Sequence, residues 1–129
     1  MMSFDPDSTA LLLIDVVNDF DFEGHEKLLR HALPAAKRIA ALKRRLAARG
    51  IPAVYVNDNF GQWQRDFADQ TERCLAPDAK GREVTETLAP GPGDFFVLKP
   101  KHSGFYATSL PVLLESLGCR TLILTGFAG

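Results

Sequence analysis

Short apolar runs alternate with helical stripes along this sequence. The apolar runs cover residues 10–14, 51–57, 95–98 and 120–125. Runs that are continuously apolar are typical of strands covered on both faces in a parallel sheet. We therefore expect four strands. Pro52 is tolerated only at the start of the second strand, and the third strand ends at Lys99.

Two helices are indicated between these runs. Residues 34–49 place three aliphatic side chains on one face, with Pro34 suited to the first turn and Gly50 to the C-terminal stop; the three are Ile39, Leu42 and Leu46. Residues 108–118 repeat leucine at helical spacing, at Leu110, Leu113, Leu114 and Leu117.

The ends of the second helix are also visible in the sequence. Thr108 or Ser109 can cap it, Pro111 fits its first turn, and Gly118 ends it. Residues 59–89 are polar and less periodic, and they predict one or two short helices around 64–76 and 82–89.

This order of elements predicts the fold. Strands that alternate with helices form right-handed crossovers, so we expect a Rossmann-like three-layer α/β/α fold with a mostly parallel sheet. A chain of 129 residues is one domain, residues 1–129. Ligands of such sheets bind beyond the carboxyl ends of the strands, which here carry Asp15, Asp58, Lys99 and the turn at Gly126.

Composition excludes several classes of partner. With 46% hydrophobic residues, 24% charged residues and a formal net charge of -1, the chain is typical of a soluble globular protein. Neither nucleic acid nor an anionic membrane is indicated, and no apolar run approaches the roughly 18 residues of a membrane span. Two cysteines and an N-terminus without a signal pattern predict a cytoplasmic protein. The expected partner is a small molecule or another copy of the chain.

Three motifs resemble those of one enzyme family. "LLLIDVVNDF" (11–20) is similar to the first-strand motif of the isochorismatase-like cysteine hydrolases, which usually has Gln where Val17 stands. "VLKPKHSGFYATSL" (97–110) resembles the lysine motif of that family, and "LGCRTLILTGFAG" (117–129) resembles the strand and turn before its nucleophile. The resemblance covers nearly the whole chain and implies the parallel α/β fold.

The resemblance also implies a reaction and its residues. The family hydrolyses a C–N bond of a small amide or ureido compound through a cysteine thioester. Asp15 would take the thiol proton, Lys99 would hold the thiolate and the acid in place, and the turn at Phe127 and Ala128 would form the oxyanion hole. By the same spacing the nucleophile lies beyond Gly129, so the last strands and helix of the family domain would be missing and the chain as given would be inactive.

Further residues near the strand ends are candidates for the substrate pocket. Phe20, Asp58, Phe60 and Trp63 could wall it, although packing in the core or at its rim is an equally open reading of the aromatic residues. Metal-binding relatives place Asp-x-His where this chain has Asp58, Asn59 and Phe60. Because the histidine is missing, we expect no metal and no other cofactor.

Alternative functions remain open at the level of sequence. Asp15 and Lys99 could be a purely structural ion pair, and a cysteine-free branch of the family cleaves a vinyl ether with the acid alone. From other classes, a phospho-receiver signalling domain would use Asp58, and a magnesium-dependent phosphatase would need an Asp where Val17 stands. Because an apolar strand precedes the C-terminus, we expect either a longer protein or a homo-oligomer that covers it.

Overall fold

The computed structural model describes residues 5–20, 23–58, 66–99 and 108–127. Four strands alternate with helices, as the sequence predicts. A single 3₁₀ turn, η1, precedes the first strand. In chain order the elements are η1 Pro6–Ser8, β1 Thr9–Ile14, α1 His25–Ala47, β2 Ala53–Asp58, α2 Phe67–Cys74, α3 Arg82–Thr87, β3 Phe95–Lys99, α4 Leu110–Ser116 and β4 Thr121–Gly126.

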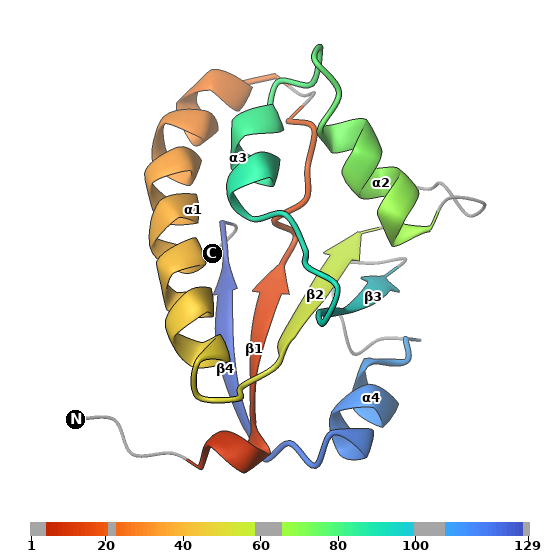
Figure 1. Ribbon diagram of the computed structural model, residues 1–129. Helices are drawn as coiled ribbons and strands as arrows, with labels where there is room; N and C mark the ends of the chain where they lie inside the picture. The colour runs from red at the N-terminus through yellow and green to blue at the C-terminus, as the bar shows by residue number, and fades with distance from the viewer. Residues whose placement is uncertain (1–4, 21–22, 59–65, 100–107, 128–129) are drawn as a thin grey trace.

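The four strands form one parallel sheet with the order β3-β2-β1-β4. Figure 1 shows all four strand arrows pointing toward the same edge of the sheet. At that edge Ile14 of β1 pairs with Gly126 of β4, and Asp58 of β2 pairs with Lys99 of β3. The carboxyl ends of all four strands therefore meet, which is where ligands bind in this class of fold.

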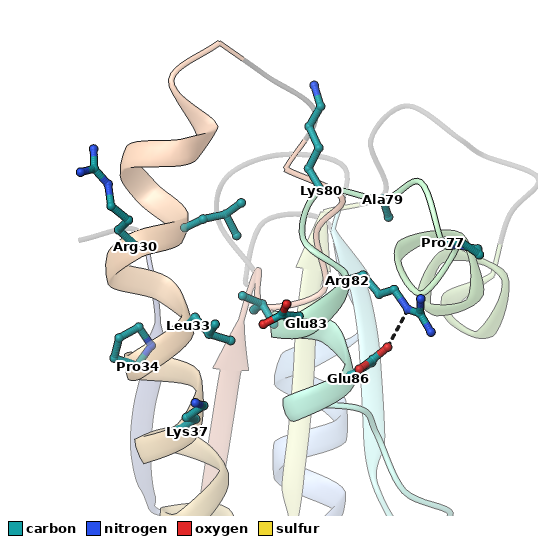
Figure 2. Close-up of a pocket in the computed structure, with 12 residues that line it drawn as sticks. Arg30, Leu33, Pro34, Lys37, Pro77, Ala79, Lys80, Arg82, Glu83 and Glu86 are labelled. Atoms are coloured by element: carbon teal, nitrogen blue, oxygen red, sulfur yellow. Dashed lines mark ion pairs between the residues drawn. The ribbon is translucent and has the colours of Figure 1, made fainter.

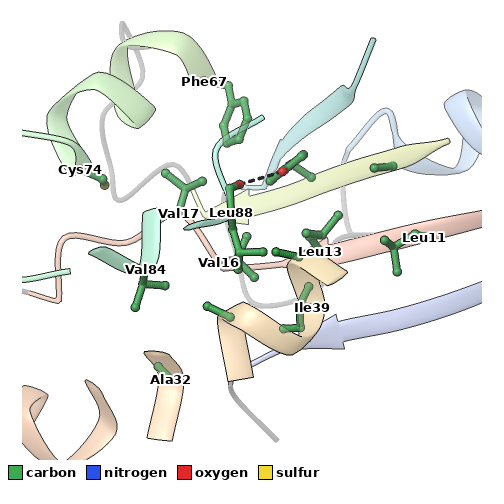
Figure 3. Packing of buried hydrophobic residues seen from close by; sticks show 14 of the residues in the cluster. Leu11, Leu13, Val16, Val17, Ala32, Ile39, Phe67, Cys74, Val84 and Leu88 are labelled. Atoms are coloured by element: carbon green, nitrogen blue, oxygen red, sulfur yellow. Dashed lines mark hydrogen bonds between the residues drawn. The ribbon is translucent and has the colours of Figure 1, made fainter. Parts of the chain in front are cut away.

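Alternate residues of β1 face two separate hydrophobic clusters. Leu11 and Leu13 join the larger cluster with side chains of α1, α2 and α3, which Figure 3 shows from close by. Ala10 and Leu12 face the other way and pack with α4. Because side chains alternate along a strand, a continuously apolar run is what a sheet covered on both faces needs. The predicted three-layer α/β/α fold is confirmed.

The predicted start of the first helix at Pro34 is wrong. α1 begins at His25, and Pro34 lies in its interior. The aliphatic stripe continues upstream through Leu28, Leu29 and Ala32, so packing onto the core extends the helix by about two further turns. Pro34 is exposed, and a helix tolerates a proline best where water can solvate the carbonyl that loses its hydrogen bond.

The other predicted helix ends are confirmed. Gly50 and Gly118 adopt left-handed conformations, with φ of 78° and 69°, two or three residues after the ends of α1 and α4. The residue after each glycine donates a hydrogen bond to a carbonyl of the last helical turn. Ile51 N–H donates to the Leu46 carbonyl, and Cys119 N–H donates to the Leu114 carbonyl, both at 3.0 Å. At the start of α4, Thr108 Oγ1 accepts a hydrogen bond from Leu110 N–H at 3.2 Å.

A buried polar network ties α1 to the sheet, well away from the strand ends. Lys43 Nζ donates to Asp94 Oδ2 at 2.6 Å and to the Tyr55 hydroxyl at 2.9 Å. The Tyr55 hydroxyl donates in turn to the Leu88 carbonyl at 2.7 Å. Burial raises the pKa of Tyr55 and favours the neutral amine of Lys43. The hydrogen bonds that Lys43 donates to Asp94 and Tyr55 outweigh burial, so the pKa of Lys43 is raised as well.

β4 is the least covered strand of the sheet. Most of its residues are exposed or half-buried, and the side chain of Leu124 is 63% exposed. This agrees with the expectation that something else covers β4, but whether this is more of the same chain or a second copy stays a prediction. In the part of the chain that the structure describes, no helix is both long enough and apolar enough to cross a bilayer.

Candidate active site

Asp15 and Lys99 meet at the carboxyl edge of the sheet. The Lys99 Nζ atom lies 2.9 Å from Asp15 Oδ2, within the range of a direct ion pair. The two residues follow or end β1 and β3, which are separated by β2 in the sheet. Lys99 therefore reaches past the end of β2 to its partner, and the pairing that the sequence predicts is present.

The two members of the pair differ in their access to solvent. The Lys99 side chain is 1% exposed, whereas the Asp15 side chain is 31% exposed. A buried ammonium is costly unless it is paired, so the Asp15 carboxylate stabilises the position of Lys99. The buried Lys99 ammonium holds the Asp15 carboxylate from the protein side, and part of that carboxylate stays accessible to solvent.

The end of β2 supplies the second contact of the acid. The backbone N–H of Asp58 donates to Asp15 Oδ1 at 2.9 Å, so each carboxylate oxygen has one hydrogen-bond donor from the protein. The Asp58 carbonyl accepts from Gln70 Nε2 of α2 at 2.6 Å. Asp58 thus lies beside the pair, and its predicted role as a wall of the pocket stays a prediction.

The turn after β4 lies next to the acid. Gly126 pairs with Ile14, the residue before Asp15, and has a φ of 158°. A Cβ atom at this position would stand 2.7 Å from the Ile14 carbonyl oxygen, so the close approach of the two strands requires glycine. Phe127 follows and is half-buried; Ala128 lies outside the described residues. The oxyanion role of Phe127 and Ala128 stays a prediction.

Of the aromatic candidates for the pocket, only Phe20 is described. Its ring is buried in the larger hydrophobic cluster, and its centroid lies 6.4 Å from that of Phe127. This agrees with the reading of Phe20 as core packing, and its role as a wall of the pocket stays a prediction. Phe60 and Trp63 lie outside the described residues, so their predicted roles stay open. The expectation of no metal depends on the same segment and also stays a prediction.

The two cysteines of the chain lie in the core and at the amino edge of the sheet. Cys74 ends α2 and is buried in the larger hydrophobic cluster. Cys119 lies between α4 and β4, at the amino edge of the sheet, and burial raises the pKa of its thiol. A cysteine packed in the core, or one whose pKa is raised by burial, is typical of a structural thiol rather than a nucleophile.

Sequence reasoning missed Asn57, the residue before Asp58. Its side chain is fully buried and forms two hydrogen bonds with Val17, accepting from the backbone N–H at 3.1 Å and donating to the carbonyl at 2.9 Å. A polar residue at the end of an apolar strand was the available signal, but its partner lies far away in the sequence. Asn57 connects β2 to the segment that carries Asp15.

A hollow of about 900 Å³ lies apart from this pair, between α1 and α3 (Figure 2). Leu29, Leu33 and Val84 contribute apolar surface to it, and basic and acidic side chains surround them. Arg82 Nε forms an ion pair with Glu86 Oε1 of the same helix at 2.6 Å, drawn as a dashed line in Figure 2. The hollow contains neither Asp15 nor Lys99, so it is not the site at the strand ends.

The strand order of the sheet differs from that of a phospho-receiver domain, which was one of the alternative functions. In a receiver the sheet order is 2-1-3-4-5, whereas here β1 lies between β2 and β4. An acid and a buried amine at the carboxyl edge of a parallel sheet make the strand ends of this α/β domain the candidate active site. The sequence profile of the Isochorismatase domain matches residues 9–129, and the chain belongs to that family.

Individual relatives agree with this assignment. The chain is 36% identical to the isochorismatase family protein YaaI of Bacillus subtilis over 120 residues, which are 93% of this chain and 65% of YaaI. It is 29% identical to the ureidoacrylate amidohydrolase RutB of Methylorubrum extorquens, with 98% of this chain and 61% of RutB covered. The chain thus spans less than two thirds of the length of these curated relatives.

Solved structures show the same fold. The cysteine hydrolase of Pseudomonas syringae pv. phaseolicola 1448A superposes with a TM-score of 0.67 at 24% identity, covering 98% of this chain and 62% of that protein. The N-carbamoylsarcosine amidase of Thermoplasma acidophilum superposes with a TM-score of 0.59 at 28% identity, covering 92% of this chain and 67% of the amidase.

Proposed function

We propose that this chain forms the acid-bearing part of a hydrolase that cleaves a C–N bond in a small ureido or amide compound. The observation that carries the proposal is the ion pair between Asp15 and Lys99, at 2.9 Å, beside the turn that follows β4. The names of two relatives, ureidoacrylate amidohydrolase and N-carbamoylsarcosine amidase, support the substrate class.

Asp15 is the proton acceptor of the proposed reaction. Its carboxylate is held by Lys99 and by the Asp58 N–H, yet about a third of the side chain stays accessible. A thiol that approaches from the open side can transfer its proton to Asp15, and the resulting thiolate attacks the carbonyl carbon. The same proton then passes to the leaving nitrogen as the C–N bond breaks, and water hydrolyses the thioester.

The nucleophile of this proposal is a cysteine that follows Gly129. Cys74 and Cys119 are excluded by their positions in the core and at the opposite edge of the sheet. Backbone N–H groups of the turn at Phe127 and Ala128 are proposed to stabilise the oxyanion. One such donor typically contributes about 10² to 10³ in rate. A residue other than cysteine at the expected position would favour the vinyl ether hydrolase instead.

The proposal is tested with a protein that extends beyond Gly129 by the residues that its gene encodes there. Hydrolysis of ureido and N-carbamoyl acids is measured for the wild type and for Asp15→Asn and Lys99→Ala. We expect kcat to fall about 10² to 10⁴-fold in Asp15→Asn, since a general base contributes that much. Full activity in either variant refutes the roles assigned here.

A matched control is available on the surface. Asp78 also forms an ion pair, with Arg73 at 3.6 Å, but its side chain is 79% exposed. We expect Asp78→Asn to leave kcat unchanged. A loss there comparable to that of Asp15→Asn would mean that the assay reports stability rather than catalysis.

Self-association and a cytoplasmic location complete the proposal. The 63% exposure of Leu124 on β4 supports coverage by a second copy or by further chain. Light scattering of the protein at micromolar concentration distinguishes a dimer or larger oligomer from a monomer.

A further inference from the structure

The segment that carries the acid has an unusual backbone. Asp15 and Phe20 adopt positive φ angles, 55° and 56°, although neither is glycine. The left-handed region is disfavoured for residues with a Cβ atom, and such residues persist only where the surrounding contacts hold them. The contacts around residues 15–20 therefore decide whether Asp15 keeps its orientation.

Three consecutive residues of β2 hold this segment. The Val56 carbonyl accepts from Asp15 N–H at 2.8 Å, and Asp58 N–H donates to the Asp15 carboxylate at 2.9 Å. Between them, the Asn57 side chain bonds both the N–H and the carbonyl of Val17. Asn57 thus replaces, with its side chain, the backbone pairing that ends where β1 ends.

Few side chains can replace Asn57. Val17 presents one donor and one acceptor, and an amide of this length offers the complementary pair. Aspartate would place a second oxygen against the Val17 carbonyl, and alanine would leave both backbone groups without a partner in a buried place.

We propose that Asn57 is a positioning residue of the reaction. By fixing the Val17 peptide to β2, it holds Asp15 in the left-handed conformation in which one carboxylate oxygen faces Lys99 and the other faces the Asp58 N–H. The inference rests on the proposed function, because it assumes that the orientation of Asp15 limits the rate.

The opposite side of the segment is held by Gly81, which precedes α3. Its N–H donates to the Asp19 carbonyl at 3.0 Å, and a Cβ atom there would collide with the Phe20 ring and approach the Asn18 carbonyl to 2.6 Å. Residues 15–20 are therefore hydrogen-bonded both to β2 and to Gly81, just before α3. Asn57 holds the end that is nearer to the acid.

The first test does not need activity. In Asn57→Ala, we expect hydrogen exchange at Asp15 N–H, relative to Leu13 N–H within β1, to accelerate about tenfold. Tyr55→Phe is the matched control, since it removes a buried side-chain-to-backbone hydrogen bond from the same strand, and the hydroxyl that it deletes bonds Leu88 and Lys43 rather than residues 15–20. An unchanged ratio in Asn57→Ala, or an equal change in Tyr55→Phe, overturns the proposal.

The second test uses kinetics of the protein that carries the residues after Gly129. We expect Asn57→Ala to lower kcat about tenfold, or about 1.4 kcal/mol, with KM within about twofold of the wild type. Tyr55→Phe should keep its kcat. In an Asp15→Asn background, Asn57→Ala should cost nothing further, because it acts through the acid.

These outcomes separate the two proposals. If kcat of Asp15→Asn is reduced but measurable, and Asn57→Ala either keeps its full kcat or loses the same factor in both backgrounds, the positioning role is wrong and the proposed function stands. If Asp15→Asn is fully active, the proposed function is wrong, and with it the kinetic role of Asn57.

Discussion

The ion pair between Asp15 and Lys99 joins side chains with very different access to water. Lys99 is 1% exposed and Asp15 is 31% exposed. Removing one partner leaves the other charge behind, and the penalty depends on how well water can solvate that charge. We therefore expect substitutions at the two ends of the pair to destabilise the fold by unequal amounts.

The burial of each partner gives the expected magnitudes. In Asp15→Ala the Lys99 ammonium stays buried without its counter-ion, and breaking such a pair typically costs about 3–5 kcal/mol. In Lys99→Met the carboxylate stays in contact with water and keeps its hydrogen bond from Asp58 N–H, so we expect a loss of about 1–2 kcal/mol. The double variant has no stranded charge and should be more stable than Asp15→Ala alone.

Urea unfolding followed by circular dichroism measures these differences. With a slope of about 2 kcal/mol per molar urea, a loss of 4 kcal/mol moves the midpoint by about 2 M. Asp78→Asn, at an exposed ion pair, should change the free energy of unfolding by less than about 1 kcal/mol. Equal losses in Asp15→Ala and Lys99→Met, with an additive double variant, would refute the reasoning from unequal burial.

Two further predictions concern the core and the turn after β4. Because the pKa values of Lys43 and Tyr55 are both raised in the folded protein, their contribution to stability is fully present below about pH 10 and is lost as the pH rises further. Unfolding free energies measured up to about pH 12 should fall more steeply for the wild type than for Lys43→Met; parallel curves would contradict this. Gly126→Ala should lose about 1–3 kcal/mol in the same assay, because its Cβ would press against the Ile14 carbonyl. Unchanged stability would show that β4 can move away from β1.

The sheet and its ion pair could be predicted because they depend on repeated, local patterns. Each strand is a short apolar run, and parallel strands bring their carboxyl ends to one edge whatever the details of the connections. Asp15 and Lys99 follow and end two of these runs, so their meeting required only the topology. The glycines that end α1 and α4 were equally readable, since left-handed conformations after a helix favour glycine.

Features that depend on long-range packing could not be predicted. Pro34 suggested a helix start, but the stripe of apolar residues upstream of it extends α1 to His25. Asn57 stood out only as a polar residue at the end of an apolar run, and its role depends on Val17, which the fold brings alongside it. Phe20 had two open readings, as a pocket wall or as packing, and only the structure shows that its ring is buried in the larger hydrophobic cluster. In each case a contact between distant segments outweighed the local pattern.

The reach of Lys99 across β2 has a consequence for folding. The charge pair joins two strands that are not neighbours, so it can close only after β1, β2 and β3 have all assembled in register. Such non-local contacts form late and slowly. A partly assembled chain would keep its acid but lack the matching cation, so a closed ion pair indicates that these three strands are in place.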